Sequence, residues 1–129
     1  YTDKALDKLQ EFLDDFPATK HKEEATSLIQ TLRNKLAKKL YETGVLYIKL
    51  DEFSSAIYSF EEIVEKYFET EYIGLAHVGI IKCHSLGKEY KKASDYFSKV
   101  EIMLQTLELS EEALGLIEKT DPANEEKSR

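Results

Sequence analysis

The feature that most constrains the fold is a triplet of residues that occurs twice. The two copies are Ala56, Phe60 and Ile63, and then Ala93, Phe97 and Val100, which stand 37 residues further on. In both copies a small, an aromatic and an aliphatic residue are spaced by four and then three positions, as on one face of a helix. Self-similarity of this kind predicts an array of helical units that bury their apolar faces against one another.

The rest of the chain also reads as helices, with no convincing strand. Apolar residues at helical spacing predict helices over residues 2–16, 20–50, 53–67 and 71–86, followed by two more that end near residues 107 and 119. Pro17 ends the first helix, and Gly87 ends the fourth. Thr70 and Ser110 are the expected N-caps of the fourth and sixth helices. The second helix, with neither proline nor turn cluster, is expected to run for about 30 residues.

The spacing of these residues is typical of the tetratricopeptide repeat, a helix-turn-helix unit of about 34 residues. We therefore predict an all-α, tetratricopeptide-repeat-like solenoid of about six helices, one of them extended. A glycine inside a helix costs about 1 kcal/mol relative to alanine, so Gly44 is interpreted as a site where two helices approach closely. The residues expected to pack the repeats are Ala5, Leu9, Phe12, Pro17, Gly44, Tyr47, Ala56, Phe60, Ala93 and Phe97.

Two features depart from a plain array. Ala5 and Ala56 are 51 residues apart, one 34-residue period plus 17, so the long helix carries an insertion. Phe68 stands where the second repeat would close with proline. Residues 1–119 are predicted to form one helical domain, and residues 120–129, which lack an apolar anchor, a disordered tail. Because the chain begins on the second helix of a repeat, it is interpreted as a fragment of a longer array.

Composition and motifs argue against nucleic-acid binding and catalysis. The net charge of −7 disfavours a phosphate-rich partner, and no apolar run is long enough to span a bilayer. His77 and His84 share a helix face but have no third ligand nearby in sequence, so no metal site is predicted. Cys83 and His84 are adjacent and therefore do not face each other, which disfavours a thiolate nucleophile. We predict no catalytic residue and no cofactor.

A protein-binding surface is the better hypothesis. On the third helix, Ser55, Tyr58, Ser59 and Glu62 lie on the side opposite the apolar face. A tyrosine among small polar residues offers a large contact area with a polar tip, which suits an interface anchor. Two alternatives stay open: other repeats or a loop cover Tyr58, or it is an ordinary surface aromatic.

The order of several motifs resembles one family. An alanine and aromatic helix is followed by "FPAT", by a long helix that contains "LRNKLA", and by "LYIKLDEF", "AIYSF" and "KYFETEY". Over residues 3–107 this resembles the C-terminal half of the BamD (YfiO) family of outer-membrane assembly lipoproteins. Departures are Leu40 at a frequent glutamate, Asp51 at a frequent glycine, and Phe68 at the proline. Cys83 lies within a helix and is not the lipid-bearing cysteine of the family.

The resemblance implies a non-enzymatic scaffold on the periplasmic face of the bacterial outer membrane, anchored by lipid through a segment absent from this chain. Its expected partners are a POTRA domain of the BamA-type barrel protein and, in some lineages, other lipoproteins of the machinery. Direct membrane insertion by this segment is not expected.

Two other functions remain open, namely a different peptide- or protein-binding repeat adaptor and a helical module appended to an enzyme. A clamp for peptide carboxylates needs lysine, arginine and asparagine in the groove. The register places other residues at those positions, which disfavours such a clamp: Tyr41, Glu42, Val45, Val78 and Gly79.

Overall fold

The computed structural model describes residues 2–15 and 22–120, and within them six α-helices follow one another. Their bounds are α1 (Thr2–Asp15), α2 (Lys22–Lys49), α3 (Phe53–Lys66), α4 (Ile73–Leu86), α5 (Tyr90–Thr106) and α6 (Ser110–Thr120). The predicted all-helical fold is confirmed, and so is the extended helix, because α2 has 28 residues. Pro17, residues 121–129 and the side chain of Phe12 lie outside the description.

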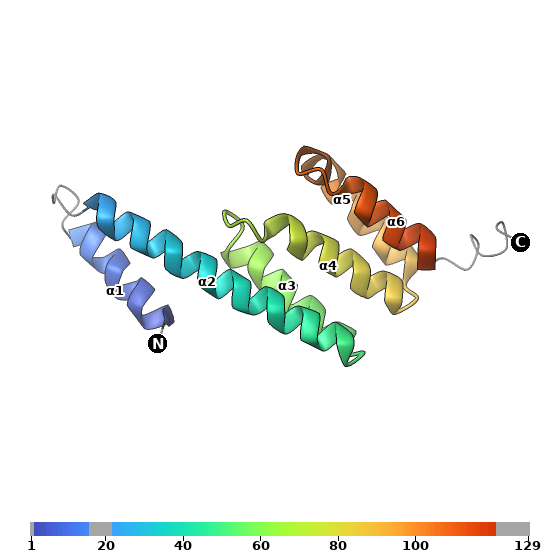
Figure 1. Ribbon diagram of the computed structural model, residues 1–129, viewed down its shortest axis with the longest axis horizontal. Helices are drawn as coiled ribbons and strands as arrows, with labels where there is room; N and C mark the ends of the chain where they lie inside the picture. Colours follow the sequence, from blue (N-terminus) through green and yellow to red (C-terminus); the bar gives the residue numbers. More distant parts are fainter. Residues whose placement is uncertain (1, 16–21, 121–129) are drawn as a thin grey trace, which may run out of the picture.

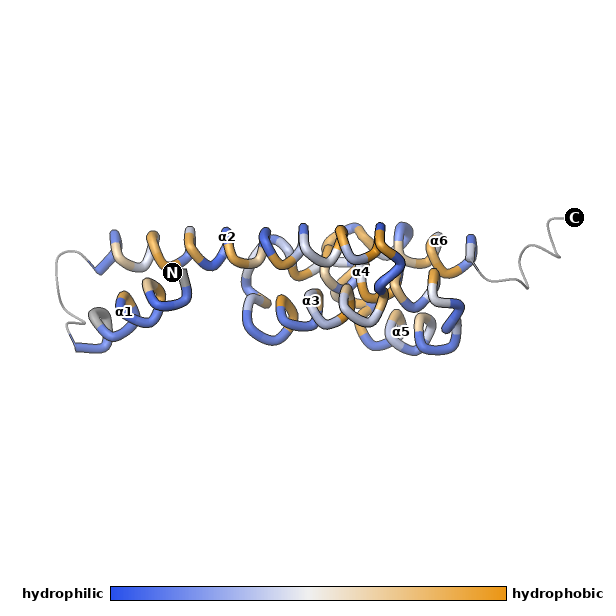
Figure 2. Tube along the Cα trace, turned by 90° about the horizontal axis from the view of Figure 1, so that it is seen from below, coloured by the Kyte–Doolittle hydropathy of each residue, from blue (hydrophilic) through white to orange (hydrophobic). Residues whose placement is uncertain are grey.

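The helices form two layers. Figure 2 shows α2, α4 and α6 in one layer and α1, α3 and α5 in the other. The second half of α2 packs with α3 and α4, whereas its first half extends beyond them and carries α1 alongside it (Figure 1). This alternation of first and second helices is the arrangement expected of a repeat solenoid.

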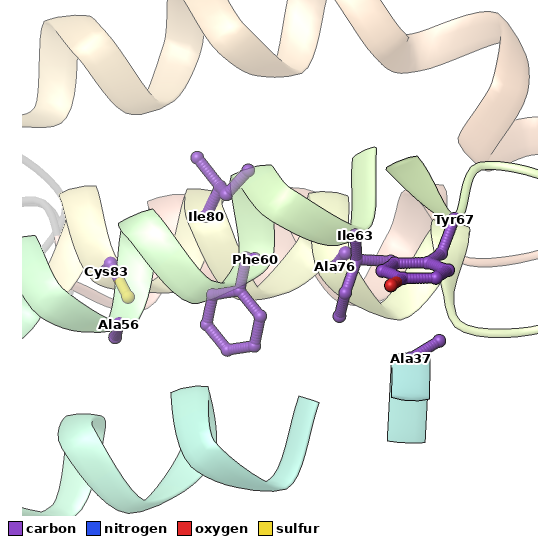
Figure 3. Close-up of a cluster of buried hydrophobic side chains, with 8 residues drawn as sticks. All are labelled: Ala37, Ala56, Phe60, Ile63, Tyr67, Ala76, Ile80 and Cys83. Carbon is purple, nitrogen blue, oxygen red and sulfur yellow. The ribbon is translucent and has the colours of Figure 1, made fainter. Parts of the chain in front are cut away.

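Phe60 of α3 is the centre of the first hydrophobic cluster. Its side chain is fully buried, together with those of Ala56, Ile63 and Ile80 (Figure 3). A Cβ atom added to Gly44 of α2 would lie 2.5 Å from Phe60 Cε1, and one added to Gly79 of α4 would lie 2.7 Å from Cε2. The ring therefore fills a slot between two glycines, one on each neighbouring helix. A second cluster, around Ala93 and Leu104, joins α4, α5 and α6.

Three helix-to-helix turns share one geometry. The second residue after the end of α2, α4 and α5 is left-handed: Asp51 has φ 58°, Lys88 63° and Glu108 60°. At the first turn the Glu52 N–H donates to the Tyr47 carbonyl at 2.9 Å, and equivalent bonds follow α4 and α5. These bonds define a Schellman motif, which usually carries glycine at its left-handed position. Asp51, noted above as a departure from glycine, therefore occupies a strained left-handed position. Lys88 and Glu108 occupy the same position in the other two turns.

The structure corrects part of what the sequence predicts for the two ends of α4. Gly87 does follow the last residue of α4, but its φ is −79°, and the left-handed residue is Lys88. Thr70 is not the N-cap, because α4 begins three residues later, at Ile73. Its hydroxyl instead donates to the Tyr67 carbonyl at 2.7 Å and accepts from the Tyr72 N–H at 3.4 Å. Thr70 thus holds the α3–α4 turn in place.

Candidate protein-docking surface

Tyr58 is the most exposed aromatic side chain on α3. Its exposed fraction is 74%, although Phe60, two residues on, is fully buried. The difference follows from the packing of α3, because Phe60 lies between α2 and α4 whereas Tyr58 lies outside that core. An exposed tyrosine on a rigid helix loses little conformational entropy when a partner covers it.

The four residues singled out on α3 line one recess of about 500 Å³ between α2 and α3. The complete lining is Thr43 and Tyr47 from α2, and Ser54, Ser55, Tyr58, Ser59 and Glu62 from α3. Ser55 is half-buried and Glu62 partly exposed. Ser59 lines the recess with the other three residues but is only 6% exposed, so it is less accessible than its place on the polar side of α3 suggests. It lies at the inner edge of the recess, because α3 is covered by helices on two sides.

Carboxylates gather on the next turn of α3. Glu61, Glu62 and Glu65 line a smaller hollow with Tyr58 and Lys66. Lys66 Nζ lies 3.3 Å from Glu62 Oε1, and this hydrogen bond raises the pKa of Lys66. The Lys66 side chain is 64% exposed, so the pair adds little to stability. The surface around Tyr58 is therefore acidic, with one amine beside it.

Arg33 fixes the turn after α3 against the extended helix. Its Nε pairs with the Glu69 carboxylate, its Nη2 donates to the Lys66 carbonyl, and its guanidinium carbon lies 4.9 Å from the centroid of the Tyr67 ring. The bond from Arg33 lowers the pKa of Glu69. Sequence reasoning missed this cluster because Arg33 and Glu69 are 36 positions apart. No local pattern of charges signals such a contact.

Two further hollows flank the repeats. One lies on the α2–α4–α6 layer and has an apolar floor that includes Tyr41, Val45 and Val78, with Lys49 and Lys82 also in its lining. The other, of about 560 Å³, is mainly apolar and lies between α3, α4 and α5. Phe68, where the repeat pattern expects proline, is 63% exposed at the rim of the second hollow.

His77 and Cys83 are placed for packing. His77 Nδ1 lies 2.6 Å from the Tyr96 hydroxyl, and burial lowers the pKa of His77. Burial also raises the pKa of Cys83 to about 12, so its thiol stays protonated and is a poor nucleophile. In the described part of the chain, no three His, Cys, Asp or Glu residues are grouped so that they could hold a metal ion. Likewise, none of the described helices has the length and apolar character to cross a membrane.

Comparison with known proteins gives one family. The family model described as YfiO, outer membrane lipoprotein, matches residues 1–100 of the chain. No curated protein matches the chain. The matched range includes every residue that lines the recess beside Tyr58.

Proposed function

Because the chain belongs to the YfiO, or BamD, family of outer membrane lipoproteins, we propose that it is a non-enzymatic scaffold of the outer-membrane β-barrel assembly machinery that docks a BamA-type POTRA domain. The family assigns the chain to the cell envelope. Within that assignment we propose the periplasmic face of the outer membrane, with the lipid carried by a segment that is not in this sequence.

The observation that carries the proposal is Tyr58. It is 74% exposed in the middle of α3, beside a recess that α2 and α3 form. Interface hot spots are enriched in tyrosine and lie in well-packed pockets from which water is excluded in the complex. Helices α2 and α3 are also held firmly together, because α2 packs closely on α3 and Arg33 of α2 binds the turn that follows α3. A rigid helix pair with an exposed aromatic anchor suits a scaffold.

The direct test is a binding titration of this chain with the periplasmic POTRA domains of BamA from the same organism. The docking variant combines Tyr58→Ala with Ser55→Glu, because a charge at the buried Ser59 would disturb the packing of α3. Phe68→Ala, which removes an aromatic side chain exposed by 63%, is the matched control. We expect the docking variant to bind at least about tenfold more weakly than the wild type, and the control to bind normally.

Circular dichroism must show equal helicity in the three proteins. A wild-type chain that fails to bind at tens of micromolar would overturn the proposal of POTRA docking. Equal loss of binding in the docking variant and in Phe68→Ala would overturn the assignment to α3 and move the interface to the apolar hollow.

A second candidate function comes from the groove on the α2–α4–α6 layer. Lys49 and Lys82 line it beside apolar side chains, which favours a peptide that ends in an apolar residue and a carboxylate. The charge of Glu112 in the same lining opposes such a ligand. Binding of a peptide with a free C-terminus, lost on amidation and on Lys82→Ala, would support this adaptor role.

A further inference from the structure

Residues of α2 and α4 that are 37 positions apart occupy equivalent places in the fold. The left-handed residues that follow the two helices, Asp51 and Lys88, are 37 positions apart. The first residues of the next helices, Phe53 of α3 and Tyr90 of α5, have the same separation. The second half of α2 can therefore be compared with α4, residue by residue, for what covers each side of the helix.

One side of α4 is covered by the helix that precedes it. Ala76, Ile80 and Cys83 of α4 are at most 1% exposed, and they belong to one buried cluster with Ala56 and Phe60 of α3 (Figure 3). This side of α4 is thus a seat for α3. In a repeat array each such seat holds the second helix of the preceding unit.

The equivalent side of α2 is open. The residues 37 positions before Ala76, Ile80 and Cys83 are Lys39, Thr43 and Leu46. Leu46 is 56% exposed, and Leu50, one turn further on, is 60% exposed. The helix that precedes α2 is α1, which lies along the first half of α2 (Figure 1). The extra turns of α2 therefore hold α1 away from the place that α3 occupies on α4.

This open side of α2 is continuous with the recess beside Tyr58. Thr43 and Tyr47 line the recess, and each stands three positions before an exposed leucine, Leu46 or Leu50. Tyr58 of α3, 74% exposed, borders the same recess. We call these five residues the open seat. Along α2 it is about 11 Å long, or two helical turns.

We propose that an amphipathic helix of the docking partner binds the open seat, in the place that α3 occupies on α4. The inference rests on the proposed function, because it states what the partner brings to the surface beside Tyr58. The equivalent side of α4 already holds a helix with an apolar stripe, which is the first reason to expect a helix here. A stripe of that kind would cover Leu46, Leu50 and Tyr58 and leave the polar side of the partner helix in water.

The second reason is that the open seat continues an interface that the fold already uses. Ala25, 9% exposed, lies in the half of α2 that α1 accompanies, and it stands 18 positions, or five whole turns, before Thr43. Both residues therefore lie on the same side of α2, and a bound helix would extend the row that α1 begins. Lys39 and Glu42 add exposed charges of both signs at the margin, which suits the polar side of such a helix better than an acyl chain.

The first experiment needs no partner protein. The probe is a peptide of residues 2–15, the α1 sequence, because the repeat register assigns the helix before α2 to this seat. A side-chain staple keeps it helical, since isolated helices of this length barely form in water. The ¹⁵N-labelled chain is titrated with the peptide. We expect amide shifts around Leu46, Leu50 and Tyr58, with a Kd on the order of 1 mM because two turns of contact bury little surface.

Three variants control this titration. A Leu9→Asp peptide and a Leu46→Asp chain should give no localised shifts, whereas a Leu114→Asp chain, altered at a leucine of α6 that is 43% exposed, should respond as the wild type does. Absence of localised shifts, or equal shifts with the Leu9→Asp peptide, overturns the helix seat whatever the POTRA domain does. Shifts of the same residues when the chain alone is concentrated would mean that a second copy fills the seat, which overturns a partner helix.

The second experiment measures POTRA binding by the Leu46→Asp, Leu50→Asp double variant, with Leu114→Asp as the control. We expect the double variant to bind about tenfold more weakly and the control to change binding less than about twofold. A photo-cross-linker on Leu46→Cys should react with partner residues three or four positions apart in one helix, and Cys83, only 1% exposed, should stay unlabelled.

The two proposals fail in different ways. If the wild type binds but the double variant binds equally well, or if the cross-links fall on a strand or a loop, the helix seat is overturned while POTRA docking stands. If the wild type does not bind, POTRA docking is overturned and the peptide titration alone decides the helix seat.

Discussion

Replacing Gly44 with alanine should destabilise the protein although alanine is the better helix former. The added Cβ would lie 2.5 Å from Phe60 Cε1 and 2.6 Å from Cζ, against ordinary carbon contacts of about 3.5 to 4.0 Å. The ring would have to move by about 1 Å. It cannot move toward α4, because the Gly79 backbone closes the slot on that side, where an added Cβ would itself meet the ring at 2.7 Å.

The magnitude follows from two opposing terms. Overpacking of a tight core costs about 1–3 kcal/mol, and the closed slot puts this site at the upper end of that range. The better helix propensity of alanine returns about 1 kcal/mol. We expect a net loss of about 2 kcal/mol in the free energy of unfolding, or roughly 8 °C in the melting temperature of a chain of this size.

The assay is equilibrium urea unfolding followed by circular dichroism. Gly115→Ala is the matched control, because a Cβ at Gly115 of α6 meets no atom within 4 Å. That variant should gain up to about 1 kcal/mol from helix propensity alone. Adding Phe60→Leu to Gly44→Ala should restore part of the loss, since the double variant relieves the clash. A Gly44→Ala protein as stable as the wild type would refute the argument that close approach is the reason for this glycine.

Three further predictions use the turns, the cysteine and the buried histidine. Lys88→Gly should raise the free energy of unfolding by about 0.5–1 kcal/mol, because Lys88 has a left-handed φ of 63°. Asp51→Gly should raise it less, since aspartate tolerates that conformation better. The urea midpoints of both variants test this. Cys83 should react with a thiol reagent at about pH 8 only after denaturation, because its side chain is 1% exposed and its pKa is about 12. If the native chain reacted as fast as the denatured chain, Cys83 would not be buried as the structure places it. Burial lowers the pKa of His77 below its ordinary 6.5, so the unfolded chain binds the extra proton. Stability should be full above about pH 6.5 and fall as the pH drops below that value, and a His77→Gln variant should show a flatter profile of melting temperature.

The helices were predictable because their apolar residues recur at helical spacing over whole turns. Gly44, Ala56 and Phe60 belong to a pattern in which each residue type has a geometric reason, and the structure places all three in the buried contacts of α2 and α3. The start of α4 was less predictable. Thr70 has the side chain of an N-cap, yet its hydroxyl satisfies the turn before the helix, a choice that depends on the tertiary position of Tyr67.

The candidate surface shows where sequence reasoning ends. Tyr58 is identifiable because a large aromatic residue on the polar side of an amphipathic helix breaks the pattern. Ser59 does not interrupt the amphipathic pattern, since a serine is compatible with either side of a helix. Its burial of 94% follows from the packing of α2 and α4 against two sides of α3. Arg33 likewise has no local signal, because its partners are 33 and 36 positions away. The positions of Ser59 and Arg33 depend on which helices are neighbours, so neither follows from a local pattern of the sequence.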